Sequence, residues 1–387
     1  MAPTIGALPV LKAIEDCGHY SHTVEPFVDQ FYQLPGRLVA SGGSIEALQR
    51  LYVETNPLVT GFSASLLVAA LCLVVSEFNR NYSQIDRLWS ILPNLHVLHL
   101  ALWARMAGLP HDRIDLVAIF STAWSIRLTY NYWRRGGYQV GSEDYRWEIV
   151  KSKIPGIIFF FFNVTFISTI QSVLLFAISG VPAYTILLAS RFEPEPRLAD
   201  YVYLVVQLGL VLSEWVSDGQ QQSKLIRTTE DLRISSLHIT YSALLLEYQN
   251  AKHRYNKDAK LPRGWSQADL DRGFNTSGLW AYSRHPNFLA EQTIWFVLYQ
   301  WSCYATNSMY SWTFLGSGSL ILLFQGSTWL TEAITAGKYA EYAVYQRRVG
   351  MFLPKSLTPY KAPSHQPKII RTSELAKRQQ RKSEKQN

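Results

Sequence analysis

A short motif at residues 278–291 carries the side chains with the clearest chemical purpose. Arg284 and His285 stand immediately before Pro286, and Glu291 follows one turn further into the expected helix. Proline suits the first position of a helix because its missing N–H would be unsatisfied there, so His285 is the expected N-cap. The free N–H groups and positive end of a helix bind anions, and the Arg284 guanidinium adds a fixed charge. The motif therefore predicts a site for a phosphate-bearing ligand.

The helix that follows Pro286 brings further polar groups to the same place. Arg284, Asn287 and Glu291 recur at the spacing of residues that share one helical face. The Asn287 amide can recognise amide or hydroxyl groups, and Glu291 can neutralise Arg284 or accept from a ribose hydroxyl. A basic anchor at a membrane surface, followed by an ion pair, is the alternative interpretation.

Charged residues also interrupt apolar segments elsewhere. Arg127 lies within an apolar run and needs a carboxylate or phosphate partner, for which Asp144 and Glu148 are candidates. Glu214 and Asp218 share a helical face at the end of another apolar run. A carboxylate near the hydrocarbon boundary is costly unless it is paired or solvated, so both are candidates for function. Ordinary polarity at a membrane boundary is the alternative.

Two further groups contain residues that could contact a ligand. Asn163 and Gln171 are eight positions apart in an apolar run and share a face that must point at protein or ligand rather than lipid. Near the C-terminus, the rings of Tyr339 and Tyr342 with Arg348 could hold a nucleotide base and a phosphate. An interfacial aromatic belt with basic residues is the better interpretation of that segment taken alone.

Long apolar segments must position these residues. A bilayer core requires about 20 apolar residues in a helix, and no charged residue occurs from Pro155 to Ser190. The weakest of the segments is Ile91–Ala104, which is short and contains two histidines. We expect an all-α fold, a polytopic membrane helical bundle of about seven transmembrane helices. The predicted spans are Leu58–Ser76, Ile91–Ala104, Ile114–Tyr130, Ile154–Val181, Ala199–Ser217, Phe288–Tyr304 and Trp312–Leu330.

Basic residues indicate the orientation of this bundle. They concentrate in Tyr132–Lys153, in Asp218–Pro286 and after Leu330, whereas Ala305–Ser311 carries no charge. Cytosolic loops carry the excess of Lys and Arg, so the C-terminus is expected in the cytosol. The N-terminal segment then lies on the far side of the membrane.

The chain is expected to have three parts. Residues 1–56 form a non-membrane segment, in which Ser44 caps a helix through Thr55. Residues 57–360 form the transmembrane domain, with a cytosolic insertion at 218–273 whose piece Ile234–Leu246 lies in the interface or re-enters. Residues 361–387 form a basic, disordered tail.

Composition excludes several classes of site. Cys17, Cys72 and Cys303 are far apart and have no metal-ligand spacing, so no metal site and no disulfide framework are expected. The basic tail has no interleaved aromatic residues, so we expect no nucleic-acid partner, and attraction to anionic lipid is the better interpretation. The sequence leaves the oligomeric state open.

Several motifs occur in an order that resembles a known family. These are Asn81–Trp89, Trp124–Leu128, Asp144–Trp147, Ser217–Gln220, Gly278–Glu291 and Tyr339–Pro354. They resemble the membrane family named domain of unknown function 1295, which is similar to the steroid 5-alpha-reductase-like enzymes. More remote relatives are the sterol C14 reductases and the isoprenylcysteine carboxyl methyltransferases. The resemblance covers Asn81–Pro354.

The resemblance implies an NADPH-dependent reductase of the endoplasmic reticulum membrane that acts on a double bond of a lipid or sterol-like substrate. Hydride delivery requires an acid that polarises the acceptor, and Glu77, Tyr82 and Asp86 are the candidates. The cofactor-binding residues expected from the motifs and clusters are Arg284, His285, Asn287, Glu291, Asp218, Tyr282, Tyr339, Tyr342, Arg348, Arg127 and Asn163.

The chain departs from the family pattern in places. Phe288 stands where the motif usually has tyrosine, and Val349-Gly350-Met351 replaces a turn that usually contains threonine. Two alternative functions stay open. One is a methyltransferase that uses S-adenosylmethionine, because the Arg-His-Pro element also occurs in that relative. The other is a non-catalytic membrane scaffold or lipid-binding protein.

Overall fold

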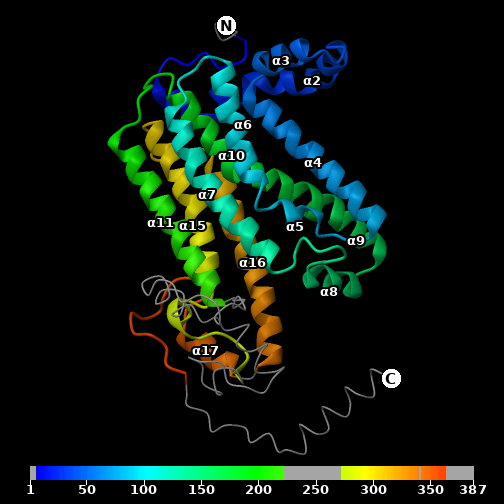
Figure 1. Cartoon of the computed structure of the whole chain (residues 1–387), viewed down its shortest axis with the longest axis vertical. Helices are drawn as coiled ribbons and strands as arrows, with labels where there is room; N and C mark the ends of the chain where they lie inside the picture. The colour runs from blue at the N-terminus through cyan, green and yellow to red at the C-terminus, as the bar shows by residue number, and fades with distance from the viewer. Residues whose placement is uncertain (1–5, 222–271, 340, 363–387) are drawn as a thin grey trace, which may run out of the picture. The chain divides into compact units, whose positions relative to one another are not determined.

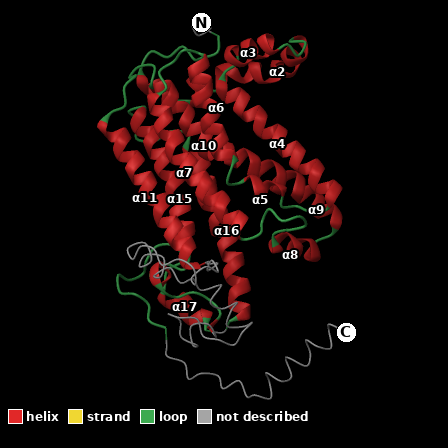
Figure 2. Cartoon of the chain, viewed as in Figure 1, coloured by secondary structure: helices red, strands yellow, loops and turns green. Residues whose placement is uncertain are grey.

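The computed structural model describes residues 6–221, 272–339 and 341–362, and the regular elements in these ranges are helices (Figure 2). The predicted all-α class is confirmed. An isolated parallel bridge joins Ser283 to Gly350. The predicted interfacial piece Ile234–Leu246 and the tail from residue 363 onward lie outside the described residues. The predicted division into three sequence segments stays a prediction.

The chain divides into two compact units. Unit 1 comprises Met1–Trp215 and Asn287–Leu330, and unit 2 comprises Val216–Pro286 and Thr331–Asn387. In unit 1 the α-helices are α1 Tyr20–Thr23, α2 Val28–Ala40, α3 Ile45–Glu54, α4 Pro57–Asn79, α5 Gln84–Leu88, α6 Leu92–Met106, α7 Asp112–Arg134, α8 Tyr145–Lys153, α9 Gly156–Phe162 and α10 Gln171–Ala189. The boundary between the units falls within α11 Leu198–Gln221, α15 Pro286–Ala305 and α16 Phe314–Lys338, and α17 Tyr342–Arg348 belongs to unit 2.

The core of unit 1 forms around α10. The π-helix η3, Asn163–Ile170, joins α9 to α10 in a continuous helical segment of 34 residues. A helix that is apolar on every face lies in a protein core or in a membrane, and 89% of the most apolar window of this segment is buried inside the protein. Helix α10 packs against α4, α6 and α7 (Figure 1).

Two other apolar helices expose their side chains instead. The apolar windows of α4 and α11 are 33% and 22% buried, and large side chains such as Leu71 and Val205 are more than half exposed. Contiguous exposed apolar surface of this kind indicates contact with lipid. Three helical segments, Pro57–Asn79, Gly156–Ala189 and Leu198–Gln220, are long and apolar enough to cross a membrane. A helix covers most of each of the seven predicted spans, and the count of seven crossings stays a prediction.

Local signals set the helix ends that matter for the site. Ser44 Oγ accepts from the Ala47 N–H at 3.1 Å and caps α3, as predicted. Helix α15 begins at Pro286, also as predicted. Arg80 adopts a left-handed conformation (φ 55°) that ends α4 and turns the chain toward α5. This turn positions the residues between Glu77 and Asp86.

Candidate functional site

The first cluster is a buried charged triad in unit 1, formed by Arg127 of α7, Glu214 of α11 and Glu291 of α15. Arg127 Nη2 lies 2.9 Å from Glu214 Oε2 and 3.5 Å from Glu291 Oε2. The three residues are 2%, 3% and 6% exposed. Two carboxylates therefore share one guanidinium inside an apolar bundle. Burying charges is costly unless they are paired, so this triad depends on all three members.

Two tryptophans complete the environment of Glu291. Trp295 Nε1, one turn along α15, donates to Oε1 at 2.8 Å, and Trp124 Nε1 of α7 donates to Oε2 at 2.9 Å. Both carboxylate oxygens thus accept a hydrogen bond away from water. The expectation that Asp144 or Glu148 would neutralise Arg127 is wrong, since its partners come from two other helices.

A second cluster of unit 1 joins two of the sequence motifs. The Tyr82 N–H donates to Glu143 Oε1 at 2.8 Å, and the Asp144 N–H donates to Ser83 Oγ at 2.9 Å. Arg87 Nη2 donates to the Ser142 carbonyl at 2.6 Å. The loop after α4 is therefore fastened to the loop before α8. The motifs at Asn81–Trp89 and Asp144–Trp147, which the sequence places far apart, form one structural feature.

Asp86 and Tyr82 lie within this second cluster. Asp86 Oδ2 accepts from Trp147 Nε1 at 2.8 Å. Burial raises the pKa of Asp86, although the Arg146 guanidinium and the Trp147 hydrogen bond oppose the rise. The Tyr82 ring is buried edge-on against Phe159, with a centroid distance of 4.6 Å. A carboxyl group with a raised pKa stays protonated to a higher pH than an ordinary one, so it can serve as a general acid.

Glu77 is joined to Asn163 at the end of α4. Asn163 Nδ2 donates to Glu77 Oε1 at 2.9 Å and to Ser76 Oγ at 3.0 Å, and its Oδ1 accepts from Ser168 Oγ at 3.1 Å. Ser168 reaches Asn163 across five residues because the π-helix has wider turns than an α-helix. Arg80 Nη1 pairs with Glu77 Oε2 at 2.9 Å. Asn163 was predicted as a cofactor ligand, but in these contacts its amide donates to Glu77.

Unit 2 contains a third cluster around the carboxylate of Glu332. Oε1 accepts from Arg284 Nε at 2.6 Å, from His285 Nε2 at 2.9 Å and from the Tyr342 hydroxyl at 3.2 Å. Oε2 accepts from Arg284 Nη2 at 2.8 Å and from Gln346 Nε2 at 3.0 Å. Burial raises the pKa of Glu332, but the hydrogen bonds from His285, Arg284 and Gln346 together outweigh it and hold the pKa well below its usual range.

Each guanidinium nitrogen of Arg284 donates within this cluster. Its remaining nitrogen, Nη1, donates to the carbonyls of Gln346, at 3.0 Å, and Val349. The expectation that Glu291 neutralises Arg284 is wrong, because Glu332 does so. The backbone of the motif is also paired, since the N–H of Arg284 donates to the Gly350 carbonyl at 2.9 Å and that of His285 to Met351 at 3.1 Å.

The other predicted cofactor residues lie in different surroundings. In unit 2, Asp218 is 3% exposed near the end of α11, Tyr282 is half-buried and Arg348 is exposed. Tyr339 and Tyr342 pack in an aromatic cluster with Phe274, with centroid distances of 6.0 and 4.9 Å. In unit 1, Asn287 is 8% exposed. Sequence reasoning missed Glu332, although a carboxylate near the end of an apolar helix is the signal that drew attention to Glu214.

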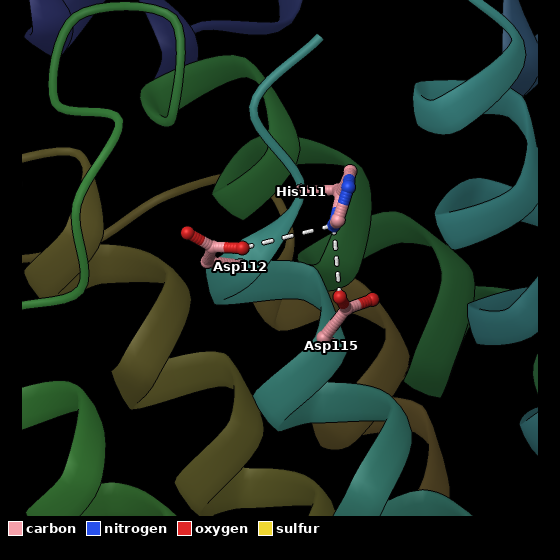
Figure 3. Close-up of side chains that lie close together, drawn as sticks. All are labelled: His111, Asp112 and Asp115. Carbon is pink, nitrogen blue, oxygen red and sulfur yellow. Dashed lines mark hydrogen bonds and ion pairs between the residues drawn. The ribbon is translucent and has the colours of Figure 1, made fainter. Parts of the chain in front are cut away.

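His111, Asp112 and Asp115 lie close together at the start of α7, and one ring nitrogen of His111 faces both carboxylates (Figure 3). His111 Nδ1 is 2.8 Å from Asp115 Oδ2 and 3.8 Å from Asp112 Oδ1. Arg105 Nη2 also donates to both oxygens of Asp115 at 2.7 Å. The Arg105 guanidinium pairs with the Asp115 carboxylate, which a metal ion would need as a ligand. Carboxylates in the first turn of a helix are also stabilised by the helix dipole. We interpret this group as an ion-paired helix start.

Comparison with known proteins identifies the family. A family model described as "Protein of unknown function (DUF1295)" matches residues 72–349. A protein of Schizosaccharomyces pombe, described as uncharacterized, is 33% identical over 350 residues, which cover 90% of this chain and 93% of that protein. No solved structure matches the chain. The chain belongs to the DUF1295 family.

Proposed function

We propose that this member of the DUF1295 family is an integral membrane enzyme that uses NADPH to reduce a double bond of a lipid or steroid-like substrate. The observation that carries the proposal is the buried triad of Arg127, Glu214 and Glu291. Ionisable residues among apolar helices are expensive, and membrane proteins retain them where a polar ligand or reaction is handled. The resemblance to steroid 5-alpha-reductase-like enzymes then suggests the reaction.

The proposal assigns proton donation to the second cluster. NADPH would supply the hydride, and the chain would supply an acid. Asp86 is the candidate we favour over Glu77 and Tyr82, because burial raises its pKa. Glu77 is instead held by Arg80 and Asn163. Trp147 orients the Asp86 carboxyl through its hydrogen bond.

The residues of unit 2 fit a phosphate only in part. Four of the five N–H groups of Arg284 donate to protein acceptors, which leaves one N–H of Nη2 for a phosphate. Arg347 and Arg348 are exposed at the end of α17. We therefore assign phosphate binding to Arg348 with Arg347, and we assign to Arg284 and His285 the role of holding the turn against Gly350 and Met351.

The proposal also includes a location. The basic residues of Tyr132–Lys153 and of the C-terminal region support a cytosolic C-terminus through the positive-inside rule. An endoplasmic reticulum membrane follows from the resemblance. An NADPH-binding surface on the cytosolic side would have access to the cofactor pool of the cytosol.

A methyltransferase that uses S-adenosylmethionine is the second candidate. Its specific support is the charge of the triad, in which two carboxylates face one guanidinium. Carboxylates attract a cation, and the sulfonium of S-adenosylmethionine is a cation. Reduced nicotinamide has no such charge.

Binding of the two cofactors to the purified full chain in detergent separates these functions. We expect saturable NADPH binding, and we expect Arg348→Ala to weaken it by about 10- to 100-fold, the effect of losing a hydrogen bond to a charged group. The matched control is Lys361→Ala, which removes an exposed cation of the same unit beyond the family-matched residues. Binding of S-adenosylmethionine without NADPH would favour the methyltransferase, and binding of neither would leave a scaffold.

A further inference from the structure

A cavity in unit 1 shares no lining residue with the three clusters. It has a volume of about 1010 Å³ and is lined by residues of α2, α3, α4 and α6. We call it the hairpin groove, because the α2–α3 hairpin beside the N-terminal end of α4 forms one wall (Figure 1). Its size is at the upper end of the range of about 300–1,000 Å³ for small-molecule sites. No charged side chain is among its lining residues.

The mouth of the hairpin groove is apolar and exposed. Tyr32 and Ile45 on the hairpin are each 74% exposed, and Leu67 of α4 and Leu102 of α6 are 61% and 53% exposed. Helix α4 is one of the segments long and apolar enough to cross a membrane. The apolar mouth beside this helix suits contact with the hydrocarbon of a bilayer. A peptide strand there would leave its backbone groups without partners, whereas a hydrocarbon chain needs none.

One polar atom in the lining lacks a partner. Ser63 Oγ is buried and makes no hydrogen bond within the described residues. Other hydroxyls of the lining are engaged, since the Tyr52 hydroxyl lies 2.8 Å from His99 Nδ1 and Thr60 Oγ1 lies 3.0 Å from His99 Nε2. A buried hydroxyl without a partner costs about 1–3 kcal/mol, and an oxygen of a ligand would remove this cost. The groove thus has a long apolar wall and, among its described residues, one buried hydroxyl without a hydrogen-bond partner.

We propose that the hairpin groove binds an acyl chain of a bilayer glycerolipid, whose ester carbonyl accepts from Ser63. The site differs from the candidate catalytic residues, because Glu77 follows Ser63 by fourteen positions on α4, which is about 21 Å along the helix axis. The bound lipid fills the space between the hairpin and the bundle and fastens α2 and α3 to α4 and α6. This role is independent of the proposed reductase activity.

Photolabelling of the full chain in phosphatidylcholine nanodiscs tests the proposal. The probe is a phosphatidylcholine with a diazirine within one acyl chain, and cross-linked peptides are identified by mass spectrometry. We expect labels on the groove-facing residues of α2 and α3. Ala64→Phe places a ring in the cavity and should lower this labelling about tenfold, which corresponds to about 1.4 kcal/mol of binding free energy. Ala70→Phe, at an exposed alanine of α4 outside the groove, should leave it unchanged.

Ser63→Ala provides a second variant in case Ala64→Phe does not fold. Losing one neutral hydrogen bond should lower the labelling by roughly three- to tenfold. Two results would overturn the proposal. One is uniform labelling along α4 as far as Leu71 and Val74 that neither variant changes, which would indicate bulk lipid alone. The other is loss of the label when a sterol is added to the nanodiscs, which would assign the groove to a sterol.

Discussion

Replacing Glu332 by glutamine should open unit 2 locally, because one carboxylate there accepts five hydrogen bonds. The amide keeps the shape of the side chain but turns one acceptor oxygen into a donor. If the amide oxygen takes the place of Oε1, the new NH₂ group faces Arg284 Nη2 and Gln346 Nε2. In the other orientation it faces Arg284 Nε, His285 and Tyr342. Neither orientation of the amide can accept all five hydrogen bonds, and Arg284 loses the negative charge that neutralises it.

The expected cost follows from the burial of the pair. Arg284 is 7% exposed and Glu332 is 4% exposed. Removing one partner of a buried ion pair typically costs about 3–5 kcal/mol. Because each 1.4 kcal/mol is a factor of ten, the population of the open state should rise by roughly 10² to a few times 10³. The control Glu341→Gln alters a carboxylate that is 34% exposed and 3.5 Å from Arg272, and it should cost less than about 1 kcal/mol.

Limited trypsin digestion in detergent measures this change. Arg347 and Arg348 lie in the last turn of α17, so cleavage there requires the helix to open, and its rate follows the open population when reclosing is fast. Acid provides a second measurement. The depressed pKa of Glu332 contributes stability that is present above the ordinary value of 4.5 and is lost as the pH falls toward the folded-state pKa. The difference in stability between wild type and Glu332→Gln should therefore become smaller as the pH falls. Cleavage of Glu332→Gln at the wild-type rate at neutral pH would refute the reasoning.

Three further predictions concern single side chains. Arg127→Met removes the guanidinium that two buried carboxylates share, so it should lower the free energy of unfolding by about 3–5 kcal/mol, measured by thermal unfolding in detergent. Asp86→Asn removes a carboxyl group whose pKa is raised by burial. As the pH rises from 3.8 through the raised pKa, the wild type should lose stability relative to the variant, and the free energy of unfolding measured over a series of pH values checks this. Gly350→Ala would place Cβ 1.9 Å from the Leu353 carbonyl and should cost about 1–3 kcal/mol or more, whereas the control Gly337→Ala meets nothing within 4 Å and should be neutral or stabilising in the same trypsin assay.

Much of the fold could be predicted because apolar segments of this length have few alternatives to forming helices. Helices cover the predicted spans, and the helix starts at Ser44 and Pro286 are correct, since capping is decided by side chains within a few residues. The pairing of distant charges is a different problem. Arg127 and Glu291 are 164 positions apart, and the sequence requires a partner for Arg127 without naming it. Closeness along the chain favoured Asp144, but Asp144 pairs with its neighbour Arg146.

The role of Arg284 shows what sequence patterns leave undecided. An arginine before the first turn of a helix predicts an anion site, because its guanidinium and the free N–H groups point the same way. The same residues can equally bind a carboxylate of the protein itself. The carboxylate that Arg284 binds belongs to Glu332, which is 48 positions away in the sequence. Five bonds on that carboxylate, with the backbone paired to Gly350 and Met351, make Arg284 a positioning residue in this arrangement. Among the described residues of unit 2, Arg347 and Arg348 are exposed at the end of α17, so we propose the phosphate site there rather than at the motif.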